Sequence, residues 1–147
     1  MKNKQSGAAL VEFALVLPLL LILTFITTEF GRALYQYNIL AKSVRDAARY
    51  MSIQTPGDTT KYPTAKNLVV YGNPSGTGTP LVIGLDDSLV PDPTWQSAGA
   101  APAINTVTVK VTGYTFQPLI HSAFGLNFGP EDGIPFAPIS ATMRGAL

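Results

Sequence analysis

The sequence predicts an α+β protein in which a long N-terminal helix packs on a small antiparallel β-sheet head. Residues 7–28 are almost without charge, and residues 30–51 place apolar side chains at helical spacing. Residues 55–147 are rich in Gly, Pro, Ser and Thr between short β-favouring runs. We therefore expect one membrane-spanning helix, its amphipathic continuation and one small β-rich domain.

The composition disfavours several function classes. Charged residues make up 13% of the 147 residues and hydrophobic ones 46%, and the net charge is +1. Soluble domains are about a quarter charged, so part of this chain needs a solvent other than water. No dense Lys/Arg run could follow a phosphate backbone, which makes nucleic acid an unexpected partner. The absence of cysteine from this chain excludes disulfides, thiolate zinc sites and cysteine nucleophiles.

The first thirty residues have the pattern of a membrane anchor. A short basic start precedes residues 7–28, in which only Glu12 is charged. Residues 13–28 alone would make about 24 Å of helix, whereas residues 7–28 make about 33 Å. Only the longer stretch spans a hydrocarbon layer of about 30 Å. The transmembrane helix is therefore predicted over residues 8–29, with Glu12 inside it.

Glu12 has two interpretations. A carboxylate at the bilayer centre costs about 2.5–3.5 kcal/mol on insertion scales. In the first interpretation, Glu12 lies at the headgroup boundary and stays hydrated. In the second, a cut after Gly7 creates a positive amino terminus on Ala8, which pairs with Glu12 of a neighbouring copy. Glu12 would then set the register of an oligomer formed through the N-terminal helix.

A secretory signal peptide is the competing interpretation of this segment. An acid at the start of the apolar region is unfavourable there, and no small-x-small cleavage site follows it. The positive-inside count leaves the orientation open, because Lys2 and Lys4 precede the span and several basic residues follow it. Those that follow are Arg32, Lys42, Arg45 and Arg49.

Residues 30–54 are expected to continue the helix as an amphipathic segment. Gly31 is the expected hinge, and Pro56-Gly57 stops the helix. The apolar side chains of this segment form a stripe along one face of the helix. This apolar stripe can cover a sheet of the same chain or pack on neighbouring helices, and we expect both uses. Its apolar positions are Phe30, Ala33, Leu34, Tyr37, Leu40, Ala41, Val44, Ala47, Ala48 and Met51.

Residues 55–147, the head domain, are expected to form a sheet with long loops. Strands are predicted at residues 68–71, 81–85, 106–116 and 138–143. Alternation with polar residues places three valines on one buried face: Val107, Val109 and Val111. Residues 139–143 alternate in the same way, so the two runs are expected to pair.

The head shows no pattern of a catalytic or cofactor-binding site. The glycine-rich residues 72–80 lack the lysine of a phosphate-binding loop, and no Gly-x-Ser-x-Gly elbow supports a hydrolase triad. His121, the one histidine, lies among apolar residues and is interpreted as packed. Trp95 is expected in a proline-rich loop, which could bury it as a structural residue or offer it to a partner, and we favour the structural role. We expect no cofactor and no enzymatic activity.

Three aspartates are weak candidates for a calcium site: Asp86, Asp87 and Asp92. Together with Ser88 they could gather oxygens around the ion. Their spacing matches no loop with a glycine pivot and a terminal glutamate. No metal is therefore expected.

Three segments resemble the TadE-like family. They are Gly7-Ala8-Ala9-Leu10-Val11-Glu12-Phe13, Glu29-Phe30-Gly31-Arg32-Ala33-Leu34 and Val44-Arg45-Asp46-Ala47-Ala48-Arg49-Tyr50. The resemblance covers roughly the first fifty residues and is to pseudopilins of tight-adherence, Flp-type pilus systems. It implies a pilin-like fold, a cytoplasmic prepilin leader over residues 1–7, and cleavage between Gly7 and Ala8 by a membrane aspartic prepilin peptidase. Glu12 would be the fifth mature residue.

The resemblance also implies partners and a place in the cell. The partners would be the membrane, the prepilin peptidase, other pilin or pseudopilin subunits and the pilus assembly machinery. The protein would cross the bacterial inner membrane once, with a cytoplasmic N-terminus and a periplasmic head, and its incorporation in a surface pilus is left open. Phe13 stands where major pilins usually have Tyr, and the chain is longer than those subunits, which favours a minor pilin acting in pilus assembly and adhesion. The alternative is a permanently anchored module that binds another envelope component.

Overall fold

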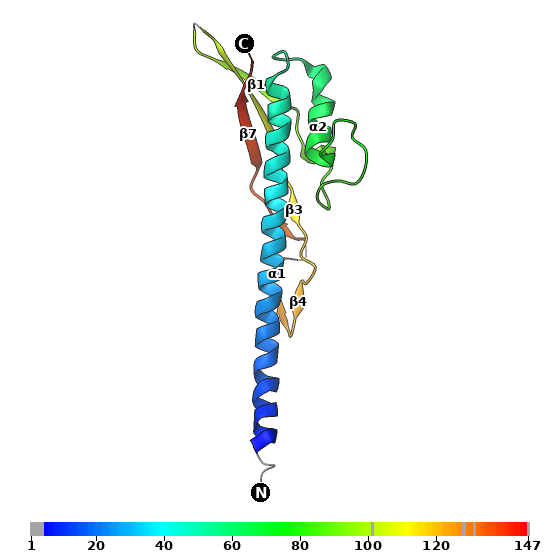
Figure 1. The fold of residues 1–147 in the computed structure, drawn as a ribbon, viewed down its shortest axis with the longest axis vertical. Helices are drawn as coiled ribbons and strands as arrows, with labels where there is room; N and C mark the ends of the chain where they lie inside the picture. The colour runs from blue at the N-terminus through cyan, green and yellow to red at the C-terminus, as the bar shows by residue number, and fades with distance from the viewer. Residues whose placement is uncertain (1–4, 101, 128, 131, 147) are drawn as a thin grey trace. The chain divides into compact units, whose positions relative to one another are not determined.

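A computed structural model describes residues 5–100, 102–127, 129–130 and 132–146. The chain is α+β as predicted, with a long N-terminal helix and a small antiparallel sheet region (Figure 1). The predicted basic start with Lys2 and Lys4 lies outside the described residues. Contacts divide the chain into a first unit, residues 1–34 and 117–134, and a second unit, residues 35–116 and 135–147.

Helix α1, Gln5–Ser52, contains the predicted membrane span and all but the last two residues of the predicted amphipathic continuation, residues 30–54. It ends close to the predicted position, where the Gln54 N–H donates to the Met51 carbonyl at 3.0 Å. The helix continues through Gly31, so the hinge predicted there is not a break. A single glycine costs a helix only about 0.5–1 kcal/mol relative to alanine, which the flanking turns offset.

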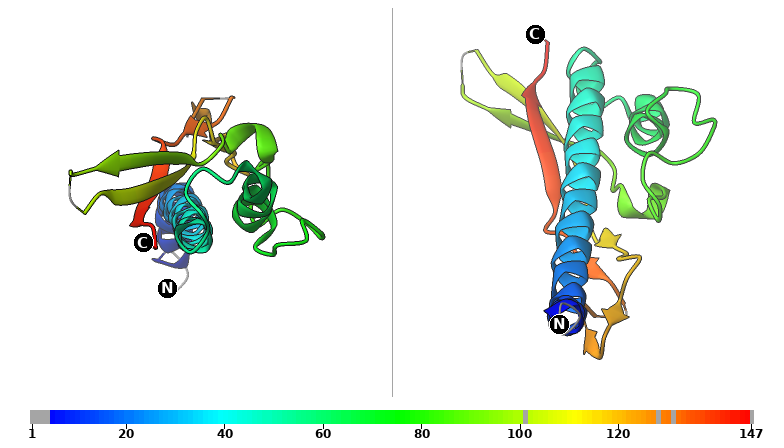
Figure 2. Two further views of the ribbon diagram at one scale, coloured as in Figure 1. Left: turned by 90° about the horizontal axis from the view of Figure 1, so that it is seen from above. Right: turned by 60° about the horizontal axis from the view of Figure 1, so that its bottom comes forward.

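The core of the second unit is built on the C-terminal part of α1. Five positions of the predicted apolar stripe are fully buried: Leu40, Val44, Ala47, Ala48 and Met51. Within this unit α1 lies between a three-stranded sheet and helix α2, Tyr62–Tyr71 (Figure 2). The stripe therefore covers a sheet of the same chain, which is one of its two predicted uses.

The three-stranded antiparallel sheet has the order β1-β2-β7. Its strands are β1, Thr94–Ala98, β2, Ile104–Val111, and β7, Ile139–Arg144. The predicted pairing of β2 with β7 is confirmed, with Val109 opposite Ala141. The predicted valine face is also confirmed, because the exposures of Val107, Val109 and Val111 are 0%, 1% and 1%. Side chains alternate with a period of two, so one register buries the whole valine face.

The strand predicted at residues 68–71 is wrong, because these residues are the last turn of α2. Its buried residues, Ala65, Val69 and Val70, follow helical rather than alternating spacing. A four-residue apolar run fits a strand and a buried helix equally well. The residues at the two ends favour the helix over the strand, because a proline occupies the first turn and Gly72, with φ 72°, ends the helix.

The strand predicted at residues 81–85 is also wrong. Val82 and Leu85 reach the core three residues apart, and Gly84 between them has a φ of 81°, which makes a turn. The strand predicted at residues 106–116 is interrupted after Val111, because Gly113 has a φ of 73°. Trp95, predicted in a loop, lies in β1 opposite Val107 and packs on the core, half-buried.

The remaining elements are short. Two 3₁₀ turns, η1, Thr59–Lys61, and η2, Asp87–Leu89, flank α2 along the chain. The other strands are β3, Thr115–Phe116, β4, Ser122–Ala123, β5, Leu126–Asn127, and β6, Ile134–Pro135. Strand β3 pairs with β6, and β4 pairs with β5 as a hairpin.

Candidate functional site

The N-terminal part of α1 exposes large apolar side chains. Among them, Phe13 is 58% and Leu15 75% exposed, and Leu10, Leu19 and Leu23 fall between these values. Among the described residues, α1 alone is long and apolar enough to cross a membrane, and none of its most apolar stretch is buried inside the protein. A core helix of a soluble protein would be covered by its own chain. The exposure therefore indicates anchoring in a membrane.

Three hydroxyl groups in this stretch find their partners inside the helix. Thr24, Thr27 and Thr28 each donate to the carbonyl oxygen four residues earlier, at 2.8 Å. Hydrocarbon offers no acceptor, so an internal hydrogen bond removes most of the cost of placing a hydroxyl there. These threonines are compatible with burial in lipid.

A charged pair follows directly after the uncharged stretch. Arg32 donates through Nη1 to Glu29 Oε2, one helical turn earlier. The same carboxylate oxygen accepts a hydrogen bond from the Leu119 N–H at 3.2 Å. Charged residues at the end of an apolar helix are typical of the membrane–water boundary. The predicted end of the span at residue 29 therefore coincides with an ion pair.

The predicted processing and assembly residues lie near the start of α1. Gly7, Ala8, Glu12 and Phe13 are all helical and exposed. A Cβ atom placed on Gly7 would meet nothing within 4 Å, so the fold does not require glycine there. Glu12 has no ion-pair partner within the described part of the chain. Any role of these residues depends on another molecule, and their assignment stays a prediction.

The three candidate aspartates make separate contacts. Asp86 caps η2, where its carboxylate accepts from the Ser88 N–H at 2.8 Å and from the Ser88 hydroxyl. These two hydrogen bonds, that of the hydroxyl first, hold the pKa of Asp86 below its usual value. Asp92 pairs with Lys66 at 2.7 Å. The described residues contain no group of three His, Cys, Asp or Glu side chains that could hold a metal ion.

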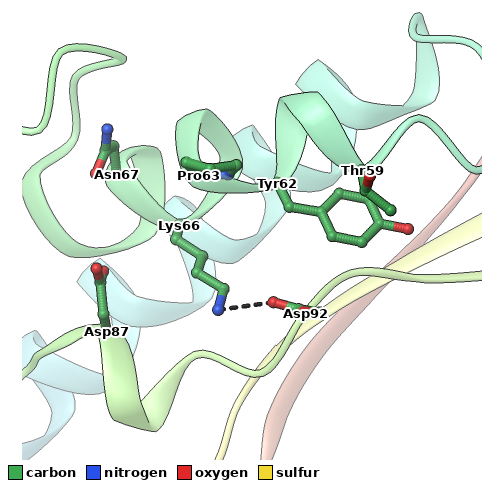
Figure 3. A pocket seen from close by; sticks show the side chains of 7 residues that line it. All are labelled: Thr59, Tyr62, Pro63, Lys66, Asn67, Asp87 and Asp92. Carbon is green, nitrogen blue, oxygen red and sulfur yellow. Dashed lines mark ion pairs between the residues drawn. The ribbon is translucent and has the colours of Figure 1, made fainter.

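Asp87 and Asp92 line an open pocket of about 400 Å³ in the second unit (Figure 3). The Lys66–Asp92 ion pair lies in this pocket, and the two side chains are 25% and 67% exposed. Such an exposed pair contributes only about 0–1 kcal/mol. Its lining residues offer hydrogen bonds but include no histidine, cysteine or serine: Thr59, Tyr62, Pro63, Lys66, Asn67, Asp87 and Asp92. The pocket can therefore hold a polar group.

Hairpin β4–β5 was not predicted, and it exposes apolar side chains outside α1. Phe124 and Leu126 are 58% and 52% exposed. His121, which was predicted to be packed, is exposed next to this hairpin. Two-residue strands are too short to show an alternating pattern, so the sequence does not reveal the hairpin. Gly125, which suits a turn, is its one sequence signal.

Comparison with known families concerns the N-terminal segment. Residues 7–49 match the model of the TadE-like protein family. The resemblance inferred from the three sequence segments is thereby confirmed over this range. The TadE-like segment lies within α1 and contains the exposed apolar stretch, Glu12 and the Glu29–Arg32 pair. No curated protein and no solved structure matches the chain.

Proposed function

We propose that this protein is a non-enzymatic pseudopilin, or minor pilin, of a tight-adherence type IV pilus system. One observation carries the proposal: the N-terminal part of the TadE-like segment is a helix whose large apolar side chains are exposed rather than covered by the chain. The family match supports association with a tight-adherence pilus system, and the exposed helix supports membrane anchoring. In this proposal the exposed helix packs on other subunits during pilus assembly, and adhesion follows from the assembled pilus.

Cleavage after Gly7 by a prepilin peptidase is the first step of the proposed pathway. Helix α1 begins at Gln5, so the Gly7–Ala8 bond lies in its first turn. Helix ends fray, because their first N–H groups have no intrahelical partner, and a peptidase can therefore unwind this turn at little cost. Removal of residues 1–7 takes away two lysines and leaves eight basic against nine acidic residues, which changes the net charge from +1 to −1.

Glu12 sets the register between copies in this proposal. After cleavage the new amino terminus on Ala8 lies four residues before Glu12. An unpaired carboxylate in the membrane costs about 2.5–3.5 kcal/mol. An ion pair between Glu12 and the Ala8 amine of a neighbouring copy offsets this cost, because each charge compensates the other. Residues 8–29 then span the inner membrane with a cytoplasmic N-terminus, residues 30–54 continue the helix, and residues 55–147 form the periplasmic head.

The intact mass of the protein from membranes of its native cells, with N-terminal sequencing, tests the proposal. We expect a chain that begins at Ala8. A chain that retains residues 1–7 in assembled material would contradict processing and the role assigned to Glu12.

The polar pocket of Figure 3 favours a second candidate function. The protein would then be a permanently anchored module whose head binds another envelope component. This candidate predicts an uncleaved Gly7 and an unchanged function of Glu12→Leu, because an anchor needs no counter-charge. The same mass measurement therefore separates the two candidates.

A further inference from the structure

Hairpin β4–β5 ends in a turn with an exposed aromatic side chain. Ala123 pairs with Leu126, which leaves Phe124 and Gly125 as a two-residue turn. Phe124 and Leu126 are more than half exposed, and so is Leu119 just before the hairpin, at 73%. Three large apolar side chains therefore lie uncovered within a few residues of one another.

The backbone of this turn does not suit phenylalanine. Phe124 has a φ of 53° and Gly125 a φ of 77°, and two successive positive φ angles are those of a type I′ turn. Asn and Gly adopt this conformation easily, whereas phenylalanine pays a conformational cost. Phe124 is the one non-glycine residue with a positive φ in the described part of the chain. The turn therefore holds an exposed aromatic side chain at a position where asparagine or glycine would cost less.

The hairpin begins at the expected membrane boundary of α1. The Leu119 N–H donates to Glu29 Oε2, and Glu29 is the first charged residue after the uncharged residues 13–28. Residues 117–130 contain no Lys, Arg, Asp or Glu. Within the first unit, the hairpin runs from this point alongside the part of α1 that precedes Glu29 (Figures 1 and 2). It is therefore level with the apolar stretch that the membrane is expected to surround.

We infer that hairpin β4–β5 docks into the lipid surface that α1 crosses near Glu29, with Phe124 and Leu126 inserted. This inference rests on the proposed anchoring of α1. An uncharged segment with an apolar tip matches the boundary between headgroups and acyl chains, where aromatic side chains are enriched. The hairpin acts as a second contact with the bilayer and fixes the depth of the first unit.

The depth of docking follows from the backbone. Each strand of the hairpin has two residues, and its outer edges leave N–H and C=O groups without strand partners. Such groups need water or headgroups, which the hydrocarbon interior does not supply. The hairpin therefore lies in the interfacial layer, while α1 crosses the whole bilayer.

Fluorescent labelling of single cysteines tests the inference, because the chain has no cysteine of its own. Full-length Ser122→Cys, which keeps Phe124, is labelled with an environment-sensitive dye and inserted as one copy into each nanodisc of phosphatidylcholine and phosphatidylglycerol. We expect blue-shifted emission, strong quenching by lipids with a nitroxide near the headgroup, and weak quenching by iodide. Labelled Thr79→Cys, exposed in the second unit, provides the aqueous reference.

A second substitution asks whether Phe124 holds the hairpin in lipid. Phe124→Asn suits the turn backbone, so the hairpin folds at least as well. In the Ser122→Cys background it should raise iodide quenching severalfold and remove the blue shift. Unchanged signals in this variant would overturn the role of Phe124.

Three outcomes distinguish a failure of hairpin docking from a failure of the membrane anchoring of α1. Labelled Leu19→Cys reports anchoring of α1 directly, and its exposure to iodide would contradict the anchoring itself. Protection of Leu19→Cys with an iodide-accessible Ser122→Cys would overturn docking of the hairpin and leave the anchor intact. Protection of Ser122→Cys only in discs with several copies would also overturn lipid docking, since a second copy would then cover the hairpin.

Discussion

At the scale of single residues, α1 contains two glycines, Gly7 and Gly31, and only Gly7 has a role in the proposed processing. A Cβ atom on Gly7 or on Gly31 would meet nothing within 4 Å, so neither is required by packing. Leucine favours a helix over glycine by about 0.5–1 kcal/mol, and both substitutions are expected to leave the helix intact. The two positions therefore form a matched pair for separating folding from processing.

Gly7→Leu should block cleavage while the protein still inserts into the membrane. The peptidase must accommodate the residue before the cut, so a large side chain there makes the uncleaved precursor the main species. Intact mass spectrometry of washed membranes measures the ratio of precursor to mature chain. Gly31→Leu should be processed like the wild type, and equal processing of the two variants would contradict the proposed cleavage site.

Asp86 should make the stability of the head depend on pH in the acid range. The Ser88 hydroxyl and N–H lower the pKa of Asp86 in the folded state below the unfolded value of about 3.9. The stabilisation is therefore present above about pH 4 and is lost as the pH falls through the lower folded pKa. Thermal unfolding in detergent should show a shallower acid decline for Asp86→Asn than for the wild type.

The exposed neighbour Asp87 offers the control for this measurement. Asp87→Asn removes the same charge from the same turn and should keep the acid decline of the wild type. A decline that weakens equally in both variants would assign the effect to net charge rather than to the Ser88 hydrogen bonds.

At the scale of elements, length and periodicity decided what could be predicted. Helix α1 and strands β2 and β7 carry their pattern over enough residues to show a period. Residues 68–71 alone fit a strand as well as the last turn of a helix, so their pattern does not reveal α2. Hairpin β4–β5 was missed because its strands are held by a turn at Phe124 that few sequences would adopt.

The packing of α1 on the sheet should control the stability of the second unit. Leu40 is fully buried in this core, so Leu40→Ala should cost about 2–5 kcal/mol. Urea unfolding of the full chain in detergent, followed by the fluorescence of Trp95, measures the loss. Ile53→Ala removes a 71% exposed side chain and should cost no more than about 0.5 kcal/mol. Similar losses in the two variants would show that α1 does not carry this core.

At the scale of the whole molecule, the proposed site at the start of α1 needs other molecules to complete it. Gly7 and Glu12 stand out in the sequence, because a charge within an apolar stretch and a glycine before it form an uncommon pattern, and their assignment stays a prediction. In the proposed function their partners are a peptidase and a neighbouring copy, and no spacing within this chain could indicate either of them. The pocket of the head could not be predicted, because its lining residues come from η1, α2, η2 and the loop at Asp92, which no sequence pattern brings together.

Assembly through α1 should place the helices of neighbouring copies within reach of a short cross-linker. Leu15 is 75% exposed and one turn from Glu12, so Leu15→Cys in membranes should give a species of twice the monomer mass with a bismaleimide. Glu12→Leu in this background should abolish the species, whereas Glu12→Asp, which keeps the carboxylate, should retain part of it. Denaturing gel electrophoresis measures the yield, and Thr79→Cys in the head is the negative control. Cross-linking that persists unchanged in Glu12→Leu would mean that the helices associate through apolar contact alone, and Glu12 would lose its role in register.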